Sequence, residues 1–232
     1  HENYQDYGKK IISISDKEIV KKLNLKMNKI INKNQNFDFN KKILNQILKK
    51  KIFFKFDGLS IDSRDIKKNN LFLTLKGKKN NGKDFIAKAL KKGASYIVSS
   101  KVNSKYKKKM IKVNNEITFL NQFARLKRKN SDATIIAITG SAGKTSLKNL
   151  LKILLQQFGN TYASPKSFNN HLGVPISLSN LNSDHKFGVF EIGMSKAGEI
   201  NNLTKMVRPN IGVITNIGEA HIENFNNIKG IA

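Results

Sequence analysis

The residues whose types and spacing could do chemistry begin in the stretch AITGSAGKTS, residues 137–146. Gly140 and Gly143 allow a tight backbone curl that can point successive N–H groups at one anion. Lys144 follows, an ammonium that could neutralise the β- and γ-phosphates of a nucleotide, and the hydroxyl of Thr145 could bind Mg²⁺. A helix starting near Lys144 would add the partial positive charge of its N-terminus.

This stretch departs from the usual phosphate-loop pattern, which has a glycine where this chain has Ile138. The cradle is formed mainly by G-x-x-G-K-T, so we still predict a nucleotide site. Its residues would be Gly140, Ser141, Ala142, Gly143, Lys144, Thr145 and Ser146. The alternative is an ordinary glycine-rich turn with an exposed lysine.

Two further groups follow apolar segments later in the chain. Glu191 lies within VFEIG, where an unpaired carboxylate is costly to bury, so we expect it to meet a cation or a hydrogen-bond network. A nucleotide-bound Mg²⁺ is a natural candidate, and a rim glutamate paired with a lysine is the alternative. His221 lies just past the segment that holds Asn216, and it is predicted as a site residue rather than a surface histidine. Glu219 and Glu223 are read as solvated charges at a helix start.

The elements that must position these groups alternate between strands and helices. Residues 133–140, 187–193 and 210–218 are short apolar runs typical of buried parallel strands. A helix follows the first run and carries one apolar stripe, formed by Leu147, Leu150, Leu151, Leu154 and Phe158. A second helix is expected over 198–207. This order predicts an α/β fold with a parallel sheet whose ligands lie beyond the carboxyl ends of the strands.

The segment SPKSFNNHLGVPIS, residues 164–177, reads as a loop between the first two strands. Asn169 and Asn170 could reach phosphate or metal-bound water, and the pattern leaves the choice between them open. Gly173 and Pro175 are expected to fix a turn.

The first part of the chain predicts a smaller α/β unit over residues 36–113. Its expected elements are a helix over 40–50, a strand over 70–77, a helix over 84–94 and a strand over 95–100. Residues 116–130 place apolar side chains on one helical face, as expected of a helix between domains. Residues 25–35 are rich in Asn and Lys and read as a linker.

Composition excludes several classes of site. The 232 residues carry a formal net charge of +27, which would suit a polyanion binder. The lysines are scattered without interleaved aromatic residues, so compositional drift of an AT-rich genome is preferred over nucleic-acid binding. With no cysteine there is no disulfide or thiolate metal site, which fits a cytoplasmic protein. No apolar run reaches the roughly 20 residues that span a bilayer.

Several motifs in order resemble the Mur ligase family. They are ITGSAGKTS, SFNNHLGVP, FEIGMSKAGEI and RPNIGVITNIGEAHIENF, preceded by LSIDSRDIKKNNLFLTLKGKKNNGKDFIAKALKKGASYIV. The family shares the shortened phosphate loop without the early glycine. The resemblance implies a uridine-nucleotide-binding domain over residues 36–130, followed by a truncated central ATPase domain over 131–232.

The motif set is most similar to the members that add D-alanyl-D-alanine to UDP-N-acetylmuramoyl-tripeptide in cytoplasmic peptidoglycan precursor synthesis. The resemblance implies ATP and Mg²⁺ as cofactors and an acyl-phosphate intermediate. It implies Lys144 on the phosphates, metal binding by Thr145, Glu191 and His221, and support from Asn169 or Asn170. In the first domain, Ser63 and Arg64 of the DSR tripeptide match the uridine-nucleotide segment. A monomer that binds neither nucleic acid nor membrane is expected.

Residues 1–24 resemble the C-terminal end of the Mur ligase that acts one step earlier, with His1 and Glu2 surviving from its motif. We therefore predict the junction of two fused ligases, cut at both ends. The family's carbamylated lysine falls just beyond Ala232, and Lys229 is not assigned that role. The adenine contacts and the D-alanyl-D-alanine domain would also lie beyond it. The chain alone is therefore expected to bind substrates poorly and not to turn over.

Three other functions stay open. The first is another ligase of the superfamily, either the member that acts one step earlier or a folylpolyglutamate synthase, although folate ligases lack the DSR-containing domain. The second is a basic P-loop protein that binds nucleic acid. The third is an inert truncated gene product. The identity of the third residue of the tripeptide, diaminopimelate or lysine, cannot be predicted.

Overall fold

The structure is a computed structural model that describes residues 34–77, 80–219, 222–224 and 227. The predicted remnant over residues 1–24, with His1 and Glu2, lies outside the described residues, and so does His221. The chain divides into a unit of residues 1–35 and a unit of residues 36–232. Residues 34 and 35, which the sequence placed in a linker, are helical.

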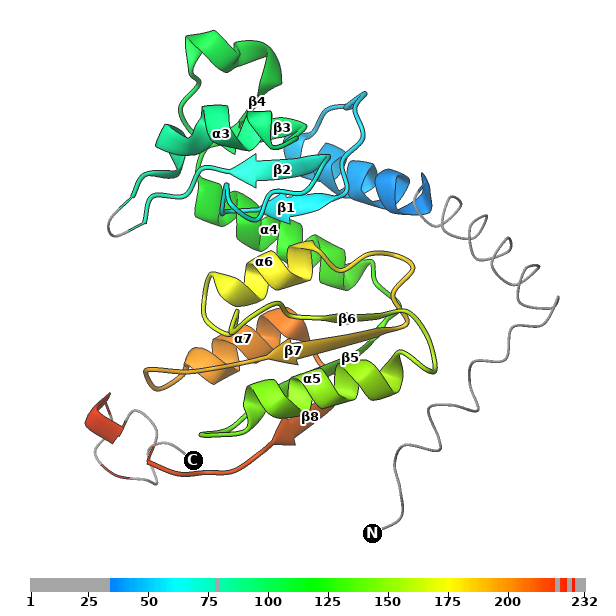
Figure 1. The fold of residues 1–232 in the computed structure, drawn as a ribbon, viewed down its shortest axis with the longest axis vertical. Helices are drawn as coiled ribbons and strands as arrows, with labels where there is room; N and C mark the ends of the chain where they lie inside the picture. The colour runs from blue at the N-terminus through cyan, green and yellow to red at the C-terminus, as the bar shows by residue number, and fades with distance from the viewer. Residues whose placement is uncertain (1–33, 78–79, 220–221, 225–226, 228–232) are drawn as a thin grey trace, which may run out of the picture. The chain divides into compact units, whose positions relative to one another are not determined.

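The second unit contains two four-stranded sheets, both wholly parallel (Figure 1). The first has the order β1-β2-β3-β4, with bounds Gly58–Ser60, Asn70–Leu73, Tyr96–Ser99 and Met110–Lys112. The helical residues 36–48 and α4 (Glu116–Lys129) pack on one face of it, and α3 (Ile86–Lys91) packs on the other. Two 3-10 turns, η1 (Gly82–Phe85) and η2 (Ser104–Lys109), complete this region.

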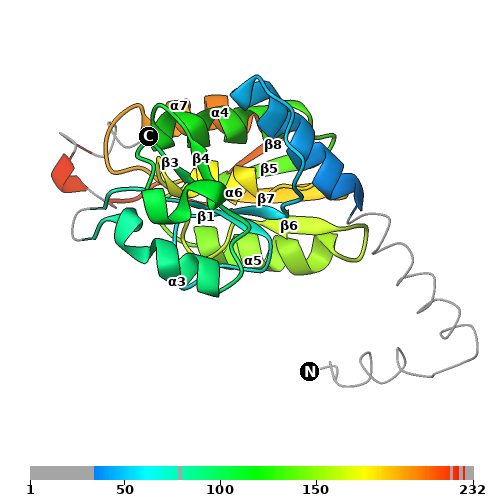
Figure 2. The same ribbon diagram turned by 90° about the horizontal axis from the view of Figure 1, so that it is seen from above.

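The second sheet has the order β6-β7-β5-β8. Its strands are β5 (Thr134–Thr139), β6 (Thr161–Ala163), β7 (Phe187–Glu191) and β8 (Ile211–Ile214). One face is covered by α5 (Lys144–Leu155) and the other by α6 (Gly173–Ser179) and α7 (Glu199–Val207), and Figure 2 shows α5 and α7 on opposite sides. A short η3 (Ile222–Asn224) follows β8. The predicted α/β class with parallel sheets is confirmed.

Residues 164–177 were predicted as a loop, which holds for 164–172, but the turn predicted at Gly173 and Pro175 was wrong, because the helix α6 begins at Gly173. All seven residues of α6 are buried, so it shows no polar face that a periodicity search could detect. Pro175 is tolerated because the N–H groups of a first helical turn lack partners within the helix. The hydroxyls of Ser177 and Ser179 donate to the carbonyls of Gly173 and Pro175, both at 2.8 Å, which satisfies them inside the core.

The apolar stripe predicted for α5 divides between core and solvent. Leu147 and Leu151 pack on the sheet as expected. Leu150, Leu154 and Phe158 are exposed, because the line of α5 that faces the sheet runs through residues 147, 148, 151 and 155. The short strand β6 was not predicted at all.

Helix α6 also joins the two sheets. The side-chain amide of Asn180, the residue after α6, donates to the carbonyl of Leu59 at 2.9 Å and accepts from its N–H at 3.0 Å. The Asn180 side chain thus pairs with the backbone of β1 much as a residue of a neighbouring strand would. A Cβ on Gly58 would lie 2.2 Å from the Asn180 side-chain oxygen, so a larger residue there would displace the Asn180 side chain. Within the described residues, no helix is long and apolar enough to cross a membrane.

Candidate nucleotide and metal site

The predicted phosphate loop connects β5 to α5, and its backbone needs both glycines. Gly140 has φ of 130° and Gly143 has φ of 78°, conformations that L side chains rarely adopt. A Cβ on Gly140 would also lie 2.2 Å from the hydroxyl of Thr215. This loop leads directly into the first turn of α5, which starts at Lys144. The first N–H groups of that turn lack partners within the helix, so they can serve an anion.

The segment after β8 holds this loop in place. The side-chain oxygen of Asn216 accepts from the N–H of Ala142 at 2.8 Å, and its carbonyl accepts from the N–H of Ser141 at 3.0 Å. Ser141 also exchanges two hydrogen bonds with Gly218, at 3.0 and 2.8 Å. Two of the amides predicted to face phosphate are therefore engaged with protein groups. In this structure, the N–H groups at the start of α5 are better placed for an anion.

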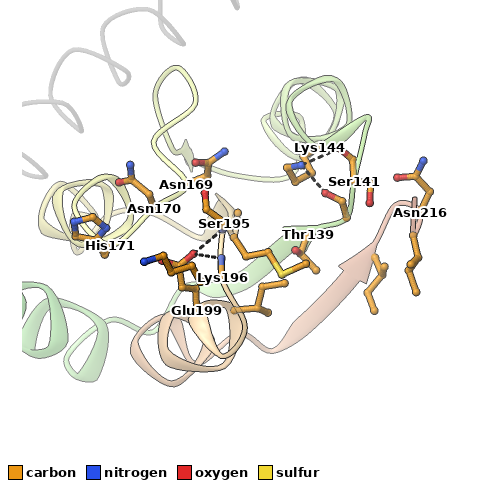
Figure 3. A pocket seen from close by; sticks show the side chains of 16 residues that line it. Thr139, Ser141, Lys144, Asn169, Asn170, His171, Ser195, Lys196, Glu199 and Asn216 are labelled. Atoms are coloured by element: carbon orange, nitrogen blue, oxygen red, sulfur yellow. Dashed lines mark hydrogen bonds between the residues drawn. The ribbon is translucent and has the colours of Figure 1, made fainter. Parts of the chain in front are cut away.

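Lys144 folds back over its own loop (Figure 3). Its ammonium donates to the carbonyl of Gly140 at 2.5 Å and contacts that of Ser141 at 3.4 Å. Among the residues that the structure describes, its partners are backbone carbonyls, and an ammonium can exchange such bonds for stronger, charge-assisted bonds to phosphate oxygens. The side chain therefore suits the predicted role, with a change of partner when phosphate binds.

Glu191, at the end of β7, lies at the centre of a buried polar network. The side chain is 2% exposed. Its Oε2 accepts from the Thr145 hydroxyl at 2.9 Å and from the Lys148 ammonium at 3.3 Å, and its Oε1 accepts from the Asn169 amide at 2.8 Å. The hydrogen-bond network that the sequence predicted around this carboxylate is thus present, and it includes a lysine. It brings residues from β7, α5 and the loop before α6 to one point.

The structure separates the two asparagines that the sequence left open. Asn169 donates to Glu191, whereas the side-chain oxygen of Asn170 accepts from the N–H groups of Leu172 and Gly173 at the start of α6, at 3.1 and 2.9 Å. Asn169 therefore belongs to the Glu191 network, whereas Asn170 holds the backbone just before α6, and both side chains border the cavity.

Lys148 was missed by the sequence reasoning. It is 2% exposed, lies one turn after Lys144, and occupies a core-facing position beside Leu147 and Leu151. A lysine on the apolar line of a helix was the available signal, because such a charge is rarely buried without a partner.

A cavity of about 720 Å³ opens beside the loop. Lys144 and Asn216 lie at one end of it and His171 at the other (Figure 3). The wall between them includes residues 193–196 and Glu199. The Glu199 carboxylate accepts from the N–H groups of Ser195 and Lys196 at 2.6 and 3.1 Å, and these bonds lower its pKa. His171 and these wall residues lie within two of the motifs that resemble the family, but the sequence analysis assigned them no site role.

A divalent ion fits the chemistry of the Glu191 network. The Thr145 hydroxyl and the Glu191 carboxylate are hard oxygen donors, which Mg²⁺ prefers, and Mg²⁺ is commonly held by one or two carboxylates together with substrate phosphates. Among the described residues, no three His, Cys, Asp or Glu side chains gather into an all-protein site. Phosphate oxygens would therefore have to complete the shell. His221, the third predicted ligand, lies outside the described residues.

Ser63 and Arg64 follow β1 in the first sheet region, and their environment differs from that of the buried Glu191 network. Ser63 is buried, whereas the Arg64 side chain is 78% exposed and pairs with Asp62 at 2.7 Å. The hydrogen bond from Arg64 lowers the pKa of Asp62 to about 2. Nearby, Lys166 pairs with Asp65 at 2.6 Å. The exposed Arg64 guanidinium is accessible to a ligand, and among the described residues no buried hydrogen-bond network holds it in place.

Comparison with known proteins agrees with this geometry. Residues 138–232 match the Mur ligase middle domain, and residues 55–128 match the catalytic domain of the Mur ligase family. The chain belongs to the Mur ligase family.

Two relatives illustrate the similarity in sequence, and both are called UDP-N-acetylmuramoyl-tripeptide–D-alanyl-D-alanine ligase. That of Rickettsia prowazekii is 46% identical over 175 residues, which are 75% of this chain and 39% of that protein. That of Bacillus subtilis is 32% identical over 75% of this chain and 39% of that protein. The chain thus matches about two fifths of the length of these relatives.

Two solved structures illustrate the similarity in fold. MurF from Acinetobacter baumannii superposes with a TM-score of 0.70 at 28% identity, over 82% of this chain and 44% of that one. MurF ligase from Thermotoga maritima in complex with ADP gives 0.61 at 32% identity, over 75% and 40%.

Proposed function

We propose that this chain carries the uridine-nucleotide and ATP sites of a MurF-type ligase. The full reaction would join D-alanyl-D-alanine to UDP-N-acetylmuramoyl-tripeptide in the cytoplasm at the expense of ATP. The observation that carries the proposal is the hydrogen bond between Thr145 and Glu191, which links the start of α5 to the end of the adjacent strand β7 beside the phosphate loop. The sequence relatives and the ADP complex of the Thermotoga maritima MurF support it.

In this reaction the γ-phosphoryl group of ATP passes to the terminal carboxylate of the tripeptide and gives an acyl phosphate with release of ADP. The amine of D-alanyl-D-alanine then attacks the acyl carbon, and the tetrahedral adduct expels phosphate to form the amide. Proteins accelerate phosphoryl transfer mainly by positioning and by neutralising charge. These are the tasks that the residues of this site can perform.

Each residue of the site has a part in that positioning. The N–H groups at the start of α5 would hold phosphate oxygens, and Lys144 would leave the Gly140 carbonyl to neutralise the β- and γ-phosphates. Thr145 and Glu191 would hold Mg²⁺, which withdraws charge from the phosphates, and Asn169 keeps the Glu191 carboxylate oriented. We assign His221 to a second metal from the resemblance alone. Ser63 and Arg64 would contact the uridine nucleotide.

We expect the chain by itself to bind nucleotide weakly and as a monomer. The proposal includes no nucleic-acid or membrane partner. A salt-dependent affinity for an oligonucleotide that exceeds the affinity for MgATP would favour the nucleic-acid alternative.

Lys144→Ala tests the phosphate site. We expect ATP to bind about 10- to 100-fold more weakly, since a hydrogen bond to a charged group contributes about 1.5–3 kcal/mol. Calorimetric titration of the chain with ATP in the presence of Mg²⁺ measures this. Lys152→Ala, an exposed lysine two turns later in α5, is the matched control and should bind as the wild type does. Equal affinities for wild type and Lys144→Ala would contradict the proposed site.

A further inference from the structure

Lys148 has contacts that the proposed function does not use. Its side chain is 2% exposed, and its ammonium donates to Glu191 Oε2 at 3.3 Å and to the backbone carbonyl of Lys166. An ammonium is expensive to bury, and these two bonds are what offset that cost here. The lysine therefore holds a carboxylate and a loop at the same time.

The loop that Lys148 holds is the one that carries Asn169. Lys166 adopts φ of 50°, the left-handed conformation that non-glycine residues rarely occupy. Its carbonyl points to Lys148, and three residues later Asn169 donates to Glu191 Oε1. Lys148 thus acts on Glu191 directly through Oε2 and indirectly through the loop that supplies the Oε1 partner.

We propose that Lys148 is a positioning residue that orients Glu191 for metal-linked nucleotide binding. With Lys148 and Asn169 each holding one oxygen, the carboxylate is fixed beside the Thr145 hydroxyl, so the two oxygen donors face one point. Without Lys148, the carboxylate loses its cationic partner and the loop loses its anchor. This inference rests on the proposed nucleotide and metal site, and it assigns Lys148 no contact with phosphate.

The test compares ATP binding in Mg²⁺ with ATP binding in excess EDTA, by calorimetric titration of the whole chain. We expect the wild type to bind ATP more tightly in Mg²⁺. In Lys148→Met this gain should shrink by about tenfold, whereas the affinity in EDTA, which depends on Lys144 and the helix start, should stay within about twofold of wild type. Lys152→Met is the matched control and should leave both affinities unchanged. A merely structural role for Lys148 would weaken both affinities together.

Thermal unfolding provides a second readout that needs no ligand. Lys148→Met should lower Tm by on the order of 10 °C, because it leaves the Glu191 charge buried without its cationic partner. Adding Glu191→Gln should restore most of that loss. Lys148→Gln keeps a donor for the Lys166 carbonyl without the charge, and it serves for the binding assay if Lys148→Met is unfolded at the assay temperature.

The possible results distinguish the role of Lys148 from the proposed nucleotide and metal site. A Mg²⁺-dependent gain in wild type that persists in the Lys148 variants would overturn the role of Lys148 and leave the proposed function standing. Equal weakening in Mg²⁺ and EDTA, or additive effects of Lys148→Met and Glu191→Gln on Tm, would also overturn it. A wild type that binds ATP with no Mg²⁺-dependent gain would overturn the proposed metal site and this inference together.

Discussion

The two sheets of this protein are both four-stranded and wholly parallel, but the charged side chains at their strand ends differ in burial. After β1, Arg64 and Asp62 form an ion pair whose guanidinium is exposed. After β7, Glu191 and Lys148 form an ion pair whose side chains are both 2% exposed. The hydrogen-bond network around this pair includes residues from β7, α5 and the loop before α6. A buried network fixes its members before any ligand arrives, whereas an exposed pair can rearrange freely around one. This contrast fits the proposed roles, in which the second region positions reacting groups and the first binds the uridine nucleotide.

The largest expected effect comes from breaking the buried pair at its acidic end. Glu191→Ala removes the partner of Lys148 and leaves an uncompensated ammonium in the core, which typically costs about 3–5 kcal/mol of unfolding free energy. The same variant should lose the Mg²⁺-dependent part of ATP binding. Denaturant unfolding and calorimetric titration measure the two effects. Asp62→Ala, which breaks the exposed pair, should cost far less stability because exposed ion pairs contribute little. Similar losses for the two variants would remove the contrast between the regions.

The next prediction concerns a buried lysine, Lys127, that lies outside the nucleotide and metal site. Burial lowers the pKa of Lys127 to about 7. Its ammonium contacts Asn40 Oδ1 at 2.6 Å and lies 4.5 Å from the ring centre of Phe39. Between about pH 7 and the unfolded value of 10.5, the unfolded chain binds more protons at this residue, so the unfolding free energy should rise with pH.

Lys127→Met checks this behaviour. Urea unfolding of wild type and Lys127→Met at several pH values between 7 and 9.5 should show a difference in unfolding free energy that shifts in favour of the wild type as pH rises. A difference that stays constant with pH would show that Lys127 titrates normally in the folded state. Lys129→Met, which alters an exposed lysine on the same helix, should show no such trend.

These positions also show how far the sequence could lead. The phosphate loop, β7 and β8 were predictable because glycines and apolar runs mark them locally. The Glu191 network was predictable in kind, since a carboxylate inside an apolar strand needs partners. Its lysine was not identified, although Lys148 stands beside Leu147 and Leu151 on the apolar line of α5, because the predicted stripe was drawn through apolar residues alone.

The features that were missed depend on tertiary contacts. Helix α6 is buried on all sides, so the periodicity that reveals amphipathic helices is absent. The strand β6 has only three residues, and its pairing with β7 defines it. Leu150 and Leu154 belong to the same apolar pattern as Leu151, and only the orientation of α5 on the sheet separates them.

The smallest expected effect concerns the exposed pair. In Arg64→Ala, the pKa of Asp62 should rise from about 2 toward its ordinary value of 3.8, because the guanidinium hydrogen bond is lost. Any stability that this pair contributes is present above pH 3.8 and is lost as pH falls toward 2. NMR titration of the Asp62 carboxyl measures the shift, and Tm at neutral pH should hardly change. An unchanged pKa would show that the pair does not persist in solution.

The central claim is that Thr145 and Glu191 jointly hold the metal of a bound nucleotide while Lys144 turns to its phosphates. A crystal structure of the chain with Mg²⁺ and a non-hydrolysable ATP analogue tests it most directly. We predict the Thr145 hydroxyl and a Glu191 carboxylate oxygen as ligands at about 2.1 Å from one Mg²⁺, with the Lys144 ammonium moved from the Gly140 carbonyl to the phosphates. A nucleotide bound elsewhere, or a metal that contacts neither residue, would contradict the account.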